Sequence, residues 1–312
     1  MVDLSGGLLA QTGPSFPTVL TIGILQGAVY GLLAVGIVLI YKGVRVFNFA
    51  QGEFGTIAAF ITFALLGGTE RAGLPYWVAM LGGLAAAVLV GLLMERLVIR
   101  PLFDAPRVTM LVATVGFALF VIAVTVLIGK PEPRSLAPVI GGPPEDLITF
   151  LGVAIEPQSI LVLVVLATLA IALGLFFSRT NLGLAVLALS QDPLATRIMG
   201  ISVTNLSRFI WGFAAFLGGL AGILQGGIPG YAITPGFMTT TFLVPSFTGA
   251  VLGGMTSLPG AFVGGLLVGV AQNIGITYLP KLGIPGSSEL TVFSLLLLVL
   301  LIRPRGLLGT EA

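Results

Sequence analysis

Three polar side chains that could do chemistry gather in the segment FNFAQGEF, at residues 47–54. Asn48, Gln51 and Glu53 lie within six residues of one another, although only 8% of the chain is charged. Polar and ionisable groups inside a bilayer are costly, and by default they mark the pathway of a solute or ion. The segment is therefore a candidate part of a translocation path.

Two structural interpretations of this segment are alternatives to a role in the translocation path. Gln51 and Glu53 would satisfy free amides where a helix begins near the cytoplasmic surface. Alternatively, the polar side chains hold a broken helix together, because irregular backbone at membrane depth needs polar partners. Gly52 favours such a break. The residues favour these architectural interpretations over direct contact with substrate.

The composition indicates that the elements around this segment lie in a membrane. The 312 residues are 56% hydrophobic, with a mean hydropathy of +1.12. A soluble domain carries about 25% charged residues. Apolar runs of about 20 residues, long enough to cross a bilayer as helices, recur along the chain. They do not alternate in polarity as the strands of a membrane barrel do.

We therefore expect an all-α integral membrane protein, a polytopic bundle of about 8–10 transmembrane helices. A single transmembrane domain would cover residues 1–312. The predicted spans are residues 18–41, 54–69, 76–98, 108–128, 157–177, 208–228, 241–255, 257–279 and 290–302.

Charge placement orients these spans by the positive-inside rule. With the N-terminus outside, the inside loops hold ten of the 14 basic residues, and the C-terminus is cytoplasmic. Residues 129–156 form an outside loop, and residues 178–207 form the longest inside loop. The inside residues are Lys42, Arg45, Arg96, Arg100, Arg107, Arg179, Arg197, Arg208, Arg303 and Arg305, and the outside residues are Arg71, Lys130, Arg134 and Lys281.

The chain lacks the residues that several kinds of enzyme need for catalysis. The chain has no histidine or cysteine, so serine–histidine and HExxH zinc protease sites are excluded, and no metal or cofactor site is expected. It has no P-loop for ATP and no basic stripe for nucleic acid. The four aspartates lie in termini or loops, which excludes an intramembrane aspartyl protease; they are Asp3, Asp104, Asp146 and Asp192. Transport of a small molecule is the better interpretation.

The inside loop contains the pattern of a short capped helix over residues 193–199. Asp192 can accept from free amides at a helix start, Pro193 suits the first helical position, and Gly200 suits the left-handed residue past the end. One face is apolar, while Thr196 and Arg197 point elsewhere; that face carries Leu194, Ala195, Ile198 and Met199. It must rest on the bilayer, on its own bundle or on a partner protein.

Glycines recur four residues apart, a spacing that lets helix backbones approach closely in lipid. Tight packing is the favoured interpretation, and the alternative is that some glycines let helices slide or bend during transport. The candidate packing positions include Gly218, Gly222, Gly253, Gly260 and Gly264.

Five segments in order resemble the permease subunits of branched-chain amino-acid ABC transporters of the LivH type. The segment NFAQGE (48–53) is similar to the family's N-F-A-x-G-E, and QDPLATRIMGI (191–201) to its cytoplasmic loop. GGLAG (218–222), VLGGMTSLPG (251–260) and RPRGLLG (303–309) are similar to its later motifs. The resemblance covers nearly the whole chain.

The resemblance implies a permease domain that pairs with a second permease, two cytoplasmic ATP-binding subunits and an external solute-binding protein. The loop helix would be the coupling helix, which seats in a groove of an ATPase through Asp192, Pro193, Leu194, Ala195, Arg197, Ile198 and Gly200. Leu194-Ala195-Thr196 replace the E-A-A of bacterial importers, and Gly212-Phe213 replace a later Leu-Pro, whereas Gly200 and Ile210 are kept.

The function implied is import of branched-chain amino acids across the cell membrane, with ATP hydrolysed by the partners and not by this chain. A urea or short-amide permease of the same family is the alternative. An ion-coupled carrier or channel is the alternative from another class, with Glu53 as its candidate acid.

Overall fold

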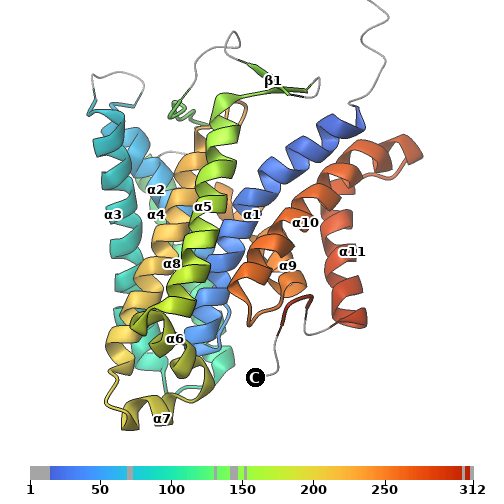
Figure 1. The fold of residues 1–312 in the computed structure, drawn as a ribbon. Helices are drawn as coiled ribbons and strands as arrows, with labels where there is room; N and C mark the ends of the chain where they lie inside the picture. Colours follow the sequence, from blue (N-terminus) through green and yellow to red (C-terminus); the bar gives the residue numbers. More distant parts are fainter. Residues whose placement is uncertain are drawn as a thin grey trace, which may run out of the picture.

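The chain folds into a bundle of helices that run between two ends (Figure 1). The computed structural model describes residues 15–68, 73–129, 132–140, 147–150, 153–303 and 306–309. Its α-helices are α1 (Phe16–Val44), α2 (Gln51–Leu65), α3 (Tyr76–Met94), α4 (Arg107–Gly129), α5 (Pro157–Arg179), α6 (Asn181–Gln191), α7 (Pro193–Ile198), α8 (Val203–Gly226), α9 (Leu243–Gly253), α10 (Leu258–Tyr278) and α11 (Ser287–Ile302).

Shorter elements complete the described part of the chain. Two π-helices, η2 (Glu95–Ile99) and η5 (Met238–Phe242), adjoin α3 and α9. Two 3₁₀ turns, η3 (Arg100–Leu102) and η6 (Leu279–Leu282), follow η2 and α10. Strands β1 (Ile148–Phe150) and β2 (Val153–Ile155) pair antiparallel.

The helical membrane fold predicted from the composition is confirmed. Six of the described helices are long and apolar enough to cross a membrane, and two shorter apolar helices accompany them. Each of the nine predicted spans coincides with a helix. The two long loops were predicted incompletely, because the inside loop contains α6 as well as α7, and the outside loop contains the β1–β2 hairpin.

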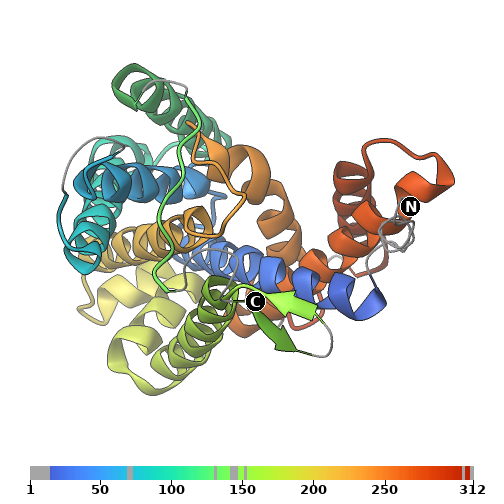
Figure 2. The same ribbon diagram turned by 90° about the horizontal axis from the view of Figure 1, so that it is seen from above.

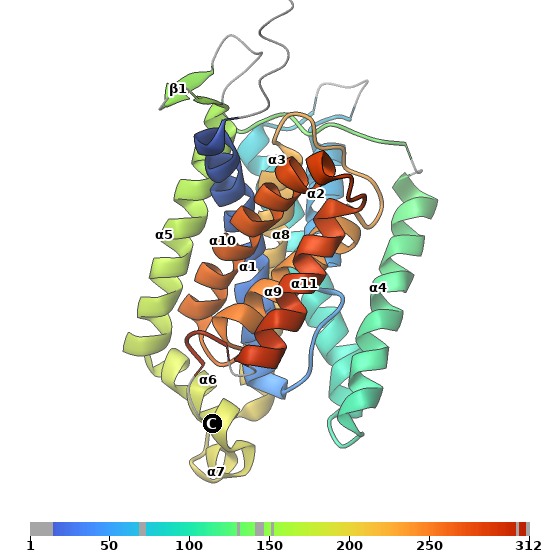
Figure 3. The same cartoon turned by 90° about the vertical axis from the view of Figure 1, so that its right-hand side faces the viewer.

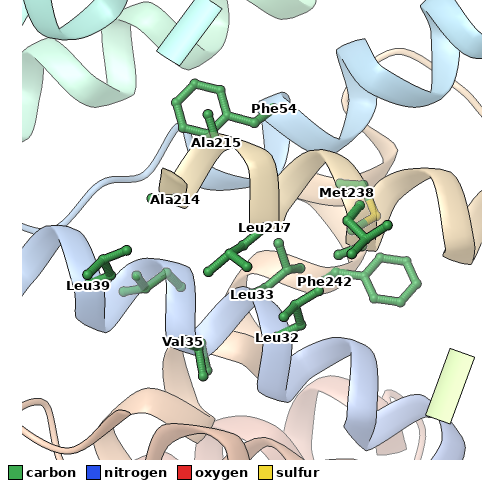
Figure 4. Close-up of a cluster of buried hydrophobic side chains, with 14 of the residues drawn as sticks. Leu32, Leu33, Val35, Leu39, Phe54, Ala214, Ala215, Leu217, Met238 and Phe242 are labelled. Carbon is green, nitrogen blue, oxygen red and sulfur yellow. The ribbon is translucent and has the colours of Figure 1, made fainter. Parts of the chain in front are cut away.

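Helices α1 and α8 form the centre of the bundle. Figure 4 shows Leu33 of α1 and Leu217 of α8 in one cluster with Phe242 of η5, and all three side chains are buried. Burial of apolar groups against other helices, through close van der Waals packing, stabilises such a core in lipid.

Glycines bring the packed helices into backbone contact. A Cβ atom on Gly27 of α1 would lie 2.7 Å from the Cα of Leu266 on α10. One on Gly222 of α8 would overlap the backbone of Gly55 on α2. At the five glycines predicted as packing positions, an added Cβ would meet another residue's backbone at 3.0 Å or less, which is the geometry that a packing role requires; they are Gly218, Gly222, Gly253, Gly260 and Gly264.

Helices α6 and α7 lie at the lower end of the bundle in Figures 1 and 3. We call this the basic end; it carries Lys42, Arg45, Arg100, Arg107, Arg179, Arg197 and Arg208. The opposite end, which carries Arg134, Lys281 and the β1–β2 hairpin, is the outer end. Arg71, Lys130 and Arg305, and the aspartates at 3 and 146, lie outside the described residues.

Two extended segments tie distant helices together. Seen from above, the segment after α4 crosses the top of the bundle (Figure 2), where Arg134 and Ile233 form a β-bridge. At the basic end, the backbone amides of Leu307 and Leu308 donate to the carbonyl oxygens of Leu252 and Gly253, at 2.8 and 3.1 Å. These carbonyls belong to the last turn of α9, which has no partners for them within the helix.

Candidate functional site

The short helix α7 has the caps that the sequence predicts. One carboxylate oxygen of Asp192 accepts hydrogen bonds from the amides of Leu194 and Ala195, at 2.8 and 3.0 Å. Gly200 follows the helix with φ of +80°, the left-handed conformation that glycine adopts without strain. The helix is therefore held at both ends by local interactions.

The apolar face of α7 points away from the protein. Leu194, Ile198 and Met199 are 67%, 77% and 79% exposed, whereas Thr196 is 3% exposed and faces the bundle. The alternative that this face rests on its own bundle is therefore wrong. This exposed apolar surface is a candidate interaction site.

Arg197 lies on the other side of α7, beside a cavity of about 510 Å³ at the basic end. Arg45, at the end of α1, and Arg107, at the start of α4, also line this cavity, together with Asp104. The helix thus has a polar side toward the basic end of the bundle and an apolar side away from it.

The side chains of Asn48 and Gln51, around the start of α2, are buried, and Gln51 is bonded to α8. The Gln51 side chain donates to the carbonyl oxygen of Ala214 at 2.8 Å, and Asn48 donates to the Gln51 side-chain oxygen at 3.3 Å. Asn48 also accepts from the amide of Ala50 at 3.0 Å. In Figure 3 this part of the chain rises from the lower end of the bundle before α2 begins.

The structure decides between the two architectural interpretations of this segment. The first turn of α2 has no side-chain cap, so the prediction that Gln51 and Glu53 cap it is wrong. The irregular backbone that needs polar partners is the run before Gln51, which begins at Arg45 with φ of +55°. Gly52 lies inside α2 and not at the break, and a Cβ there would be 2.7 Å from the amide of Thr239.

Glu53 has a different environment from its two polar neighbours. Its side chain is fully buried, and among the described residues neither carboxylate oxygen has a hydrogen-bond partner of normal geometry. Its polar neighbour is the hydroxyl of Thr239 on η5, which is also unbonded. Thr239 was missed by the sequence analysis, although the run MTTTF interrupts an apolar span.

A second polar region, at the outer end, was also missed. A cavity of about 440 Å³ lies between α1, the start of α5 and the end of α8. Glu156, Gln225 and Tyr231 are among its lining residues. Gln225, a single polar residue in the apolar run GILQGG, was the available signal. Within the described ranges, no group of three or more acidic residues could hold a metal ion.

Buried polar groups within a bundle of apolar helices are typical of a multi-pass membrane protein. The family model described as "Branched-chain amino acid transport system / permease component" matches residues 19–302. The chain belongs to this family of transport permease subunits.

Three relatives cover most of this chain. The high-affinity branched-chain amino acid permease protein BraD of Pseudomonas aeruginosa is 33% identical over 300 residues, covering 92% of this chain and 94% of BraD. LivH of Escherichia coli is 27% identical over 299 residues, covering 92% and 93%. LivM of the same organism is 28% identical over 304 residues, covering 90% of this chain and 68% of LivM.

Proposed function

We propose that this chain is one of two permease subunits of an ABC importer for branched-chain amino acids. The family and the names of BraD and LivH support the substrate class. The chain has no P-loop, so ATP would be hydrolysed by partner subunits in the cytoplasm. An external solute-binding protein would deliver the amino acid.

The observation that carries this proposal is the exposed apolar face of α7. Ile198 and Met199 project from a helix that Asp192 caps at its start and Gly200 ends. A capped helix with such a face suits a groove in an ATPase, as the family resemblance implies. Motion of the ATPase would then pass through Thr196, the buried side of α7, into the bundle.

A second permease supplies the other half of the proposed translocation path. This chain is similar to both LivH and LivM of Escherichia coli, which supports a pair of two different but related chains. The large exposed side chains of α4 include Leu119 and Phe120, at 62% and 64%, and those of α11 include Leu301, at 83%. A partner permease and lipid would share these surfaces.

The clustering of arginines at the basic end supports a cytoplasmic location for that end and for the C-terminus. The outer cavity would then face the binding protein. The path would alternate between an outward-open and an inward-open state as the ATPases close and separate.

Uptake measurements test the proposed function directly. Radiolabelled leucine and urea are offered to cells with the gene deleted, and to the same cells carrying it on a plasmid, each with unlabelled competitor. We expect only leucine uptake to depend on the gene. Gene-dependent uptake of urea alone would replace the substrate and keep the architecture, and dependence of neither would contradict the proposal.

A further inference from the structure

The outer cavity has both an aliphatic wall and polar groups. It lies at the outer end, where the first turns of α1 approach the start of α5 and the segment after α8. Its volume of about 440 Å³ suits a small molecule, since ligand pockets span about 300–1,000 Å³. Its aliphatic lining residues are Ile22, Leu25, Leu147, Ile155, Ile228 and Pro229.

Glu156 is the one charged residue among those that line this cavity. It directly precedes α5, and its side chain is partly exposed. None of the lining residues is basic, so the charge of Glu156 has no internal counterion there. A carboxylate at the edge of an aliphatic pocket favours a ligand that carries a cationic group next to an apolar one.

Gln225 supplies an independent observation on the same cavity. It is 1% exposed, and neither atom of its side-chain amide has a hydrogen-bond partner of normal geometry among the described residues. The hydroxyl of Tyr231, also in the lining, is its close polar neighbour. A buried amide that makes no hydrogen bond costs about 1–3 kcal/mol. A ligand that bonds to it would recover that free energy.

Two other glutamines nearby show that unused amides are not general in this region. Gln158 accepts from the amide of Val139 at 2.9 Å and donates to the carbonyl oxygen of Leu224 at 3.2 Å. Gln26, which also lines the cavity, donates to the Tyr30 hydroxyl at 2.7 Å and accepts from Asn273 at 3.0 Å. Gln225 therefore differs from these two glutamines, because neither of its amide atoms has a hydrogen-bond partner of normal geometry among the described residues.

We infer that the outer cavity binds one zwitterionic amino acid with an aliphatic side chain. The Glu156 carboxylate accepts from the ligand ammonium, the Gln225 amide donates to its carboxylate, and the aliphatic wall holds its side chain. The inference rests on the proposed function and adds to it a recognition site on the permease itself, besides the one on the external binding protein.

Equilibrium binding tests this inference. The full complex is purified from native membranes through a tag on this chain, placed in nanodiscs without the binding protein, and titrated with radiolabelled leucine. We expect saturable binding. Glu156→Gln and Gln225→Leu should each weaken it by about tenfold or more, because a hydrogen bond to a charged group contributes about 1.5–3 kcal/mol. Glu289→Gln, an exposed acid at the start of α11, is the matched control.

Competition by two leucine analogues distinguishes binding from misfolding. Isoamylamine lacks the carboxylate and 4-methylpentanoate lacks the ammonium, so both should compete weakly with the wild type. The Gln225→Leu variant should no longer prefer leucine to isoamylamine, because it has lost the contact to the carboxylate. The Glu156→Gln variant should no longer prefer leucine to 4-methylpentanoate, because it has lost the contact to the ammonium. A variant that misfolds would lose all binding instead and would fail to copurify its partners.

Two results would overturn the inference. One is the absence of saturable leucine binding to a complex that still transports leucine with its binding protein, which would leave the proposed function intact. The other is leucine binding that both substitutions leave unchanged. Failure of the proposed function would be a different result, namely a wild-type complex that transports a solute other than leucine.

Discussion

The side-chain nitrogen of Gln51 donates to the carbonyl oxygen of Ala214, 163 residues away and inside α8. Gly218, one turn further along α8, leaves the space for this contact, because a Cβ there would lie 3.1 Å from the same nitrogen. The polar segment before α2 and the glycine spacing of α8 therefore form one structural feature. It fixes the start of α2 against the centre of the bundle.

Replacement of Gln51 by leucine should destabilise the protein without preventing its insertion. Asn48 would lose its acceptor in a fully buried place, and a buried polar group left unpaired costs about 1–3 kcal/mol. We expect a lower midpoint of thermal unfolding in detergent, measured by size-exclusion chromatography. Gln191→Leu, at the exposed end of α6, is the control and should behave as the wild type. Equal midpoints for both variants would contradict the anchoring role.

Two glycine-to-alanine substitutions should have opposite outcomes. Gly222→Ala would force a Cβ into the backbone of Gly55, and overpacking of this kind costs about 1–3 kcal/mol. Gly116 of α4 has no atom within 4 Å of the added Cβ, so Gly116→Ala should be neutral or slightly stabilising. The yield of folded protein and its unfolding midpoint measure the difference. A neutral Gly222→Ala would show that α2 and α8 separate more easily than their packing indicates.

A charge on the apolar face of α7 should break the proposed coupling. Ile198 is 77% exposed, so Ile198→Asp leaves the fold intact but places a carboxylate in the proposed ATPase groove. We expect normal membrane insertion, weak copurification of the ATPase and loss of uptake. Ser178→Asp adds the same charge to an exposed position at the same end of the bundle and should retain uptake. If Ile198→Asp also retained uptake, the coupling assignment would be wrong.

Leucine binding at the outer cavity should weaken in acid. Burial raises the pKa of the Glu156 carboxyl above its usual value of about 4.3. As the pH falls through this raised pKa, the carboxylate becomes neutral and loses its attraction for an ammonium group. Tyr231, the other titratable group in the lining, stays neutral because burial raises its pKa. Leucine binding to the wild type should therefore weaken as the pH falls, whereas the Glu156→Gln variant should bind leucine weakly at every pH. If the two proteins showed parallel pH profiles, Glu156 would not be the group that binds the ammonium.

The substitution Glu53→Gln tests whether the Glu53 carboxyl has a structural role or couples transport to an ion. Glutamine has nearly the same shape, and no described residue forms an ion pair with Glu53. We expect near wild-type assembly, ATP hydrolysis and leucine uptake in proteoliposomes. Loss of uptake with normal ATP hydrolysis would instead favour the ion-coupled alternative. Thr239→Val, which removes the neighbouring hydroxyl, shows whether the polar pair acts as a unit.

Local features were predictable from the sequence, and contacts between distant residues were not. The caps of α7 depend on Asp192 and Gly200, which lie beside the helix, so composition and order were sufficient. The glycine spacing predicted close packing, but it did not show that Gly222 meets Gly55. Likewise, the polar segment was predicted to be architectural, but the sequence did not show that Ala214 is its partner.

Local backbone geometry explains two features that the sequence analysis did not resolve. Glu95, within the predicted span 76–98, is fully buried and pairs with Arg100 at 2.8 Å, because the π-helix η2 brings residues five positions apart together. Helix α6 was predicted as part of the inside loop, residues 178–207. Its start is nevertheless marked by Thr180, whose hydroxyl accepts from the amide of Gly183 at 3.0 Å.

The hydrogen bonds from Leu307 and Leu308 to α9 also impose an order on biosynthesis. The ribosome makes α9 before α10 and α11, yet the carbonyl oxygens of Leu252 and Gly253 find these partners only when residues 307 and 308 emerge. A nascent chain that stalls earlier leaves the last turn of α9 without these hydrogen-bond donors. Helix α9 therefore acquires its full set of hydrogen bonds only after α10, α11 and the segment that follows them have been translated.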